Sequence, residues 1–120
     1  PAEMLSDGTL RVLALIYLLY FSDYEKIFIE EPGRNLHPSL IANLMLKVKD
    51  AAENTDKQIF LTTHNVEVLR HTPAEDVRLV SRNDDGFTQV ERPAESERVQ
   101  KFIENDLGMV DLYTENMLGE

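Results

Sequence analysis

The chain of 120 residues contains no cysteine and no tryptophan, and it is poor in basic residues. Without cysteine, neither a disulfide framework nor a thiolate metal site can form. Twelve lysines and arginines stand against 22 aspartates and glutamates, so the formal net charge is −10. Such a surface disfavours general binding to nucleic acid phosphates, although it leaves room for a local basic patch.

Long hydrophobic runs are also missing. The longest run, residues 12–21, is about half as long as the roughly 20 residues that a membrane-spanning helix needs. The opening Pro-Ala-Glu lacks the basic and apolar regions of a signal peptide. We therefore expect a cytoplasmic protein without membrane contact. The hydrophobic content of 42% suits one modest core, so residues 1–120 are expected to form a single unit, a domain or part of one.

In the first half of the chain, segments whose apolar residues recur with the period of a helix alternate with short apolar segments typical of strands. The pattern predicts a helix over residues 7–21 with Ser6 as its N-cap. This helix is apolar nearly all round, so we expect most of seven residues to be core: Leu10, Val12, Leu13, Leu15, Ile16, Leu18 and Leu19. The following elements are expected to be a strand at 26–30, a helix at 38–54, a strand at 58–62 and a short helix at 65–70.

Both strands are continuously apolar in the middle, which predicts a mainly parallel sheet covered by helices on both faces. Further along, residues 77–81 and 87–91 flank the Asp-Gly dipeptide at 85–86, which is a strong hairpin signal. Helices are expected at 95–105 and 107–118. The fold class is therefore α/β, with a C-terminal β-hairpin and helices.

The most informative segment is Lys-Ile-Phe-Ile-Glu-Glu-Pro at residues 26–32, where an apolar strand runs into two carboxylates. At the carboxyl end of a buried strand, Glu30 and Glu31 could hold Mg²⁺ beside a nucleotide, with Glu31 left to polarise a water molecule. Taken alone, two acidic residues after a strand are as often a solvated turn.

Two further segments suit the same chemistry. Ser6, Asp7 and Gly8 place a hydroxyl and free backbone amides at a helix N-terminus, which suits a phosphate, although an ordinary N-cap also explains them. His64 follows the second strand and could hydrogen-bond a γ-phosphate or a water molecule, whereas a lone histidine is more often structural. His37 is a weaker candidate.

In this order, the segments resemble ATP-binding-cassette-type ATPases. The similar branch includes the overcoming-lysogenization-defect ATPases and the chromosome-maintenance and repair ATPases, and the most similar group is the compact bacterial AAA_21 type. Leu-Ser-Asp-Gly-Thr at 5–9 resembles the signature motif, and residues 27–31 resemble the Walker B strand with its catalytic carboxylate. Asn-Leu-His-Pro at 35–38 resembles the D-loop, and His64 the switch histidine. The resemblance implies the C-terminal lobe of a P-loop NTPase-type fold.

The resemblance also implies a mechanism in which ATP and Mg²⁺ are sandwiched in a head-to-tail homodimer. Glu30 would support Mg²⁺, usually through water, and Glu31 would orient the attacking water molecule. His64 would sense the γ-phosphate. The residues implied to act across the dimer interface are Ser6, Asp7 and Gly8, which would contact the ATP of the partner subunit, and Asn35 to His37 of the D-loop.

Three departures from the family pattern matter. Glu30 stands where most members have aspartate, and Asp7 replaces a glycine, but similar branches share both features. More seriously, none of the five glycines belongs to a Gly-x-x-x-x-Gly-Lys-Ser/Thr loop, so this chain cannot itself cradle the β- and γ-phosphates. We expect the lobe with the P-loop to precede residue 1 in the intact protein, and we expect the 120-residue chain alone to be inactive.

Two other classes of function stay open. The first is a nucleotide-independent interaction domain that kept the fold, for which the missing P-loop is the best support. The second is a metal-dependent hydrolase or nuclease with Glu30, Glu31, His37 and His64 as ligands. For the ATPase, the driven process could be DNA repair or phage defence, with DNA contacted through other domains.

Overall fold

The computed structural model describes residues 7–97, which belong to two compact units that divide between residues 68 and 69. Ser6 and almost all of the helices expected at 95–105 and 107–118 lie outside the described residues. The first unit contains α1 (Asp7–Tyr20), β1 (Lys26–Glu30), α2 (Pro38–Asn54), β2 (Gln58–Thr62) and the start of α3 (Val66–Arg70). The second contains the 3₁₀ turns η2 (Ala74–Asp76) and η3 (Pro93–Glu95) and the strands β3 (Leu79–Arg82) and β4 (Thr88–Glu91).

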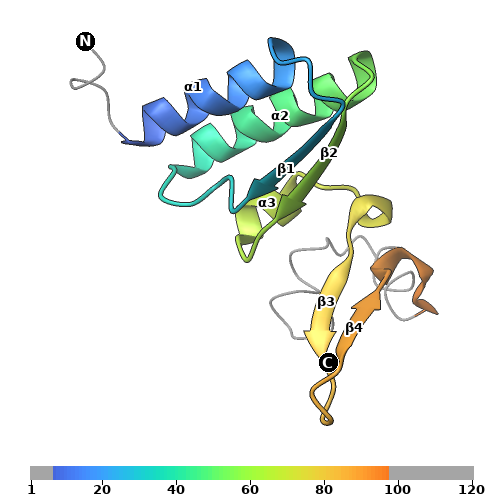
Figure 1. Cartoon of the computed structure of the whole chain (residues 1–120). Coiled ribbons are helices and arrows are strands. Elements are labelled where there is room, and N and C mark those ends of the chain that lie inside the picture. Colours follow the sequence, from blue (N-terminus) through green and yellow to red (C-terminus); the bar gives the residue numbers. More distant parts are fainter. Residues whose placement is uncertain (1–6, 98–120) are drawn as a thin grey trace. The chain divides into compact units, whose positions relative to one another are not determined.

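In the first unit, β1 and β2 form a parallel pair in which Lys26 lies opposite Gln58 and Glu30 opposite Thr62. The helices α1 and α2 lie side by side against one face of this pair (Figure 1). The core between the helices and the strands consists of Leu15, Leu19, Ile27, Ile29, Leu44, Val48 and Ala51. The α/β class and the parallel pairing are therefore confirmed.

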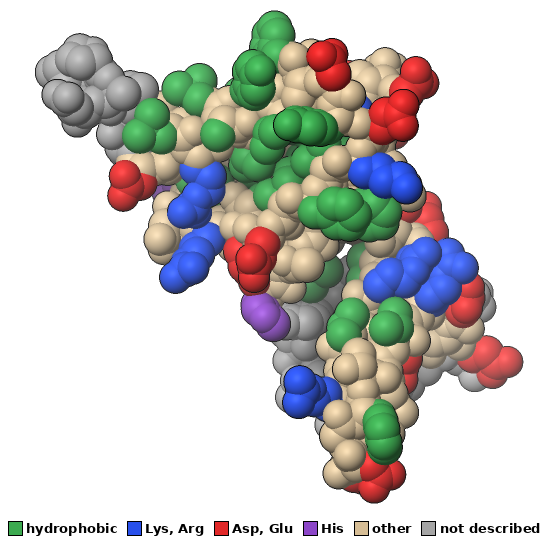
Figure 2. All heavy atoms as spheres, viewed as in Figure 1, with side chains coloured by type: hydrophobic (Ala, Val, Ile, Leu, Met, Phe, Trp, Pro, Cys, Tyr) green, Lys and Arg blue, Asp and Glu red, His purple; other side chains and the backbone are tan. Residues whose placement is uncertain are grey.

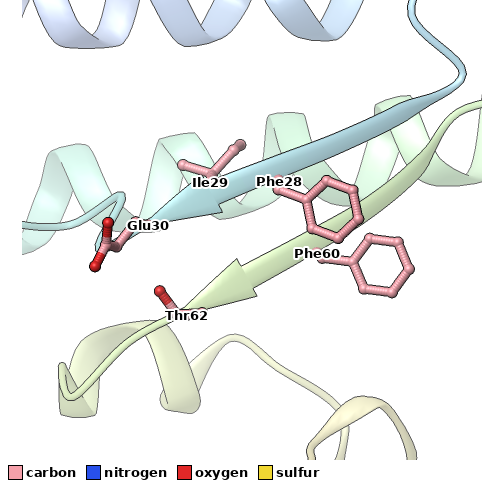
Figure 3. Close-up of a pocket in the computed structure, with 5 residues that line it drawn as sticks. All are labelled: Phe28, Ile29, Glu30, Phe60 and Thr62. Carbon is pink, nitrogen blue, oxygen red and sulfur yellow. The ribbon is translucent and has the colours of Figure 1, made fainter.

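Within the described part of the first unit, residues 7–68, no helix covers the opposite face of the strand pair (Figure 1), and the prediction of a sheet covered on both faces was wrong for this unit. Phe28 is 73% exposed and Phe60 is 41% exposed. The two residues are register partners, and their rings stack with centroids 4.6 Å apart. Figure 3 shows the rings side by side on this open face.

The prediction that most apolar residues of α1 are core was also wrong. Only Leu15 and Leu19 are buried, while Leu13 is 51% exposed and Leu10 is exposed as well. The reason is that α1 packs on one side only, against α2 and the strands. Hydrophobic side chains are visible over its outer surface in Figure 2.

The second unit is built on a hairpin. β3 and β4 pair antiparallel, with Leu79 opposite Glu91 and Arg82 opposite Thr88. Gly86 has a φ of 84°, which is the left-handed conformation that a glycine adopts without strain. Asn83 closes the loop, since its side-chain oxygen accepts from the amide of Phe87 at 2.8 Å. The hairpin predicted from Asp-Gly is thus confirmed, with slightly shorter strands.

Candidate functional site

The first unit gathers polar groups where its parallel strands end. The two carboxyl ends lie at the same edge, as in other parallel sheets that place ligands there (Figure 1). The loop that follows β1, residues 31–37, passes the segment that follows β2, residues 63–65. Contacts between these two segments define the candidate site.

Glu31 forms most of the polar contacts between the two segments. One carboxylate oxygen accepts from the amide of His64 at 2.9 Å, and the other from the hydroxyl of Thr63 at 3.2 Å. The amide of Glu31 donates to the carbonyl of Thr62 at 2.8 Å. Its φ of 48° is uncommon for a residue with a side chain, and such backbone strain persists where surrounding contacts fix it. The structure therefore holds this carboxylate in one orientation beside His64.

Thr63 and Asn65 complete this arrangement, and the sequence interpretation had given them no role. The hydroxyl of Thr63 accepts from the amide of Asn65 at 2.9 Å while it donates to Glu31. The side-chain oxygen of Asn65 accepts from the amide of Glu67 at 2.9 Å, at the start of α3. The signal was the Thr-Thr-His-Asn run after an apolar strand, because hydroxyl and amide side chains there are suited to short backbone contacts.

Gly33 permits the close approach of the two segments. A Cβ atom at this position would lie 3.2 Å from the side-chain nitrogen of Asn65 and 3.2 Å from Cδ1 of Ile41. The neighbouring Pro32 is fully buried. A larger residue at Gly33 would force the side chains of Asn65 and Ile41 to give by a few tenths of an ångström.

Glu30 lies apart from these contacts. It is exposed on the open sheet face opposite Thr62. Figure 3 shows both side chains beside a hollow that is also lined by Phe28, Ile29 and Phe60. The two adjacent glutamates therefore have different surroundings: one side chain is hydrogen-bonded to the segment after β2, and the other borders an apolar surface.

His64 and His37 also differ in their surroundings. His64 is exposed and is tied to Glu31 through its backbone amide. Nδ1 of His37 accepts from the amide of Ser39 at 3.2 Å, so His37 is the N-cap of α2. That cap accounts for His37 without any ligand. Within residues 7–97, no three histidine, aspartate or glutamate residues are close enough to hold a metal ion as one cluster.

The N-terminus of α1 reaches the same loop from another direction. Asp7 is the first residue of this helix and is exposed. A Cβ atom on Gly8 would lie 3.1 Å from Cδ2 of Leu36 and 4.0 Å from the carbonyl oxygen of Asn35. Asn35 is exposed and has a φ of 60°. The structure thus brings Gly8 together with Asn35, and Glu31 together with His64.

Comparison with known protein families shows to which family the chain belongs. Residues 1–70 match the family described as "AAA domain, putative AbiEii toxin, Type IV TA system". The chain belongs to this AAA domain family. The matched region contains every candidate site residue, from Ser6 to His64, and ends at the close of α3.

One solved structure supports the fold of this AAA domain. It is described as "Structural biochemistry of ATP-driven dimerization and DNA stimulated activation of SMC ATPases". The two chains are 16% identical, the TM-score is 0.62, and the match covers 87% of this chain and 62% of the other. This chain therefore spans less than two thirds of the structure it resembles. No curated protein matches the sequence.

Between residues 7 and 97, each helix is too short or too polar to cross a membrane. The resemblance to an ATP-binding-cassette-type ATPase of the AAA_21 group, proposed from the sequence, is confirmed by the family match, and the P-loop NTPase-type fold by the similarity to the SMC ATPase.

Proposed function

We propose that this chain is the C-terminal lobe of a cytoplasmic ATP-binding-cassette-type ATPase. In the intact protein, ATP is bound and hydrolysed between the subunits of a head-to-tail homodimer. The observation that carries the proposal is the Glu31 carboxylate, fixed at the end of a parallel strand by Thr63 and by the amide of His64. A carboxylate held there suits the orientation of an attacking water molecule, because phosphoryl transfer depends mainly on positioning and electrostatics.

The oxygen-bearing side chains of the candidate site are suited to binding Mg²⁺ together with ATP. Glu30 and Thr62 present a carboxylate and a hydroxyl side by side, and Mg²⁺ prefers oxygen ligands. One or two carboxylates are sufficient, since Mg²⁺ usually keeps water molecules and takes further oxygens from the nucleotide phosphates. Bound Mg²⁺ would neutralise charge on the β- and γ-phosphates. Glu30 is proposed to hold it, with water in between.

The remaining site residues are proposed to work in two groups. Glu31 and His64 act on the nucleotide of their own subunit, as water-orienting base and as sensor of the γ-phosphate. Ser6, Asp7 and Gly8 contact the γ-phosphate of the partner subunit's nucleotide, and Asn35 and His37 lie at the dimer interface. The position of Gly8 supports the second group, because a Cβ atom on Gly8 would lie 4.0 Å from the carbonyl oxygen of Asn35, so both residues belong to one region of the first unit.

A lobe with a P-loop is proposed to complete the site from the upstream part of the same protein. Two observations support it. The chain has no P-loop glycine pattern of its own. In addition, the strand pair exposes Phe28 and Phe60 on one face, and exposed aromatic side chains of this kind favour a covering partner.

Two observations bear on the alternatives. A metal-dependent hydrolase with Glu30, Glu31, His37 and His64 as joint ligands is not favoured, because His37 caps α2 and no cluster of three such residues forms between residues 7 and 97. A nucleotide-independent interaction domain is favoured only by the missing P-loop.

The proposed process is phage defence or DNA repair. The family description names a toxin of a toxin–antitoxin system, and the similar solved structure belongs to work on DNA-stimulated SMC ATPases.

ATP turnover tests the proposal. We would compare the full-length protein, its Glu31→Gln variant and the 120-residue chain. Glutamine keeps one acceptor oxygen, for the amide of His64, and places an NH₂ group beside the Thr63 hydroxyl, while it removes the negative charge that polarises water. We expect ATP binding to persist in the variant while turnover falls by at least about a hundredfold, and we expect the short chain to be inactive. Near-normal turnover by Glu31→Gln would refute the assignment, and no turnover by any form would favour the interaction domain.

A further inference from the structure

Arg11 connects α1 to the loop that follows β1. Its guanidinium Nη1 donates a hydrogen bond to the main-chain carbonyl of Arg34. Arg11 follows Gly8 by three positions, so the two residues lie on the same face of the helix. Gly8 leaves room on this face for the side chain of Leu36, because a Cβ atom on Gly8 would lie only 3.1 Å from Cδ2 of Leu36. One face of α1 therefore hydrogen-bonds the loop at Arg34 and lies close to the loop at residues 35 and 36.

The loop needs such external contacts. Glu31 and Asn35 both have positive φ values, 48° and 60°, within five residues. Each left-handed non-glycine residue costs on the order of 1 kcal/mol or more, and such conformations persist only where neighbours fix them. Inside the loop, the amide of Arg34 donates to the carbonyl of Glu31 at 3.1 Å, and the amide of Leu36 to that of Gly33 at 3.2 Å. The first of these hydrogen bonds connects Arg34, the residue that Arg11 binds, directly to the backbone of Glu31.

The other contacts of the loop fix its opposite side. Glu31 is hydrogen-bonded to the segment that carries His64, and His37 caps α2. Gly33 leaves room for the side chain of Asn65, which a Cβ atom at this position would approach to 3.2 Å. Arg11 supplies a side-chain hydrogen bond between the first turns of α1 and this loop. It therefore joins the part of the site around Gly8 to the part around Glu31.

We propose that Arg11 is a positioning residue that makes the N-terminus of α1 and residues 31–37 move as one body. The inference rests on the proposed function. In the dimer, the surface around Gly8 contacts the partner's nucleotide, while Glu31 acts on the nucleotide of its own subunit. Through Arg11, engagement of one nucleotide sets the position of the carboxylate at the other. Arg11 itself touches neither nucleotide.

The test uses Arg11→Met and Arg11→Lys in the full-length protein carrying Glu31→Gln, so that ATP-bound dimers persist. Methionine keeps the apolar stem but cannot donate a hydrogen bond, whereas lysine can donate to the Arg34 carbonyl. We expect Arg11→Met to raise the ATP concentration at the midpoint of dimerisation about tenfold, which is about 1.4 kcal/mol, and Arg11→Lys to restore much of the loss. Dimerisation is read by sedimentation or light scattering.

Arg34→Met is the matched control. It removes a neighbouring positive charge but keeps the backbone carbonyl that Arg11 binds, so we expect the midpoint to stay within about twofold of the parent. A loss as large as that of Arg11→Met would show that local charge, and not the hydrogen bond, matters, and would overturn the proposal. Backbone hydrogen exchange provides a second readout: a peptide covering residues 32–37 should exchange faster in Arg11→Met and return toward the parent rate in Arg11→Lys.

The outcomes distinguish the positioning role from the proposed function. If the parent dimerises with ATP and Arg11→Met leaves both the midpoint and the exchange rate unchanged, the positioning role is refuted while the proposed function stands. Faster exchange with an unchanged midpoint would reduce Arg11 to a structural contact and also refute the role. If the parent itself forms no ATP-dependent dimer, the proposed function fails, and this inference fails with it.

Discussion

At the residue scale, the structure gives the carboxylates of two adjacent glutamates different surroundings. Both oxygens of Glu31 accept hydrogen bonds from the segment after β2, whereas Glu30 lies on the open face opposite Thr62. The difference arises from the backbone, because the positive φ of Glu31 turns the chain immediately after the strand. One carboxylate is thereby suited to orienting a water molecule, and the other to holding a hydrated cation at the sheet edge.

Thr63 provides a prediction at this scale. Thr63→Val keeps the shape of the side chain but removes the hydroxyl that donates to Glu31 and accepts from Asn65. Because a hydrogen bond to a charged group contributes about 1.5–3 kcal/mol, we expect kcat for ATP to fall about tenfold or more. KM should change little, since Thr63 orients the carboxylate and does not touch ATP. Steady-state kinetics of the full-length protein measure both constants.

Thr63→Ser is the control for that substitution, because it keeps the hydroxyl and should retain most of the activity. Equal losses in Thr63→Ser and Thr63→Val would contradict the orienting role. A fall confined to KM would also contradict it, since that result would assign Thr63 to nucleotide binding.

At the element scale, the sequence predicted the regular structure of the first unit well and its burial poorly. The strands at 26–30 and 58–62 and the helix at 38–54 were predicted with their bounds, because proline, glycine and polar residues mark where each begins and ends. Burial failed because apolar residues look the same whether a neighbour in this chain covers them or not. Phe28 is apolar and 73% exposed, and Leu13 in α1 is apolar and 51% exposed.

The candidate site was predicted from sequence to the same partial extent. The order of acidic and histidine residues after each apolar strand predicted that Glu31 and His64 lie close together, since parallel strands end at one edge, and the structure contains this contact. Their roles in catalysis stay predictions. The contacts of Thr63, Asn65 and Arg11 could not be predicted in this way. They depend on side-chain contacts between three segments that are far apart in the sequence. Hydrophobic periodicity contains no information about such contacts.

The contact between α1 and α2 provides a pH-dependent prediction. The hydroxyl of Tyr20 donates to the Asp50 carboxylate at 2.6 Å. Burial first, and then the bond to Asp50 and its negative charge, raise the pKa of Tyr20 from 10.0 to about 12. The hydrogen bonds from Tyr20 and Asn54 lower the pKa of Asp50. The folded state thus favours a neutral tyrosine and a charged aspartate.

The sign of the effect follows for each end of the pH range. The raised pKa of Tyr20 gives stability that is fully present below pH 10.0 and is lost as the pH rises from 10.0 through about 12. The lowered pKa of Asp50 gives stability that is present above the ordinary aspartate pKa and is lost as the pH falls below it. We expect Tyr20→Phe to lower the unfolding temperature most near neutral pH.

Thermal unfolding of wild type and Tyr20→Phe over this range measures the effect, and the difference between them should shrink toward pH 12. Tyr24→Phe is the control, because Tyr24 is 65% exposed and this substitution should leave the unfolding temperature close to that of wild type throughout. A difference between wild type and Tyr20→Phe that stays constant from neutral pH to pH 12 would contradict the assigned contact.

At the scale of the whole molecule, this chain is proposed to be a lobe that needs other parts to act. The AAA domain match ends at residue 70, and this chain spans 62% of the SMC ATPase chain whose fold it shares. The hairpin after residue 68 was predicted from its turn. The central claim is that Glu31 and the segment at Ser6 act on different nucleotides, so each site needs residues from two subunits.

Mixing two inactive full-length variants tests this claim most directly. Glu31→Gln removes the water-orienting carboxylate, and Ser6→Arg blocks the contact with the partner subunit's nucleotide. In a mixed dimer of the two variants, both defects fall on one site, and the other site is intact. With free subunit exchange and unbiased pairing, half of the dimers have one active site of two, so we predict ATP turnover of about a quarter of the wild-type rate in an equimolar mixture. A mixture as inactive as its components would contradict sites shared between subunits.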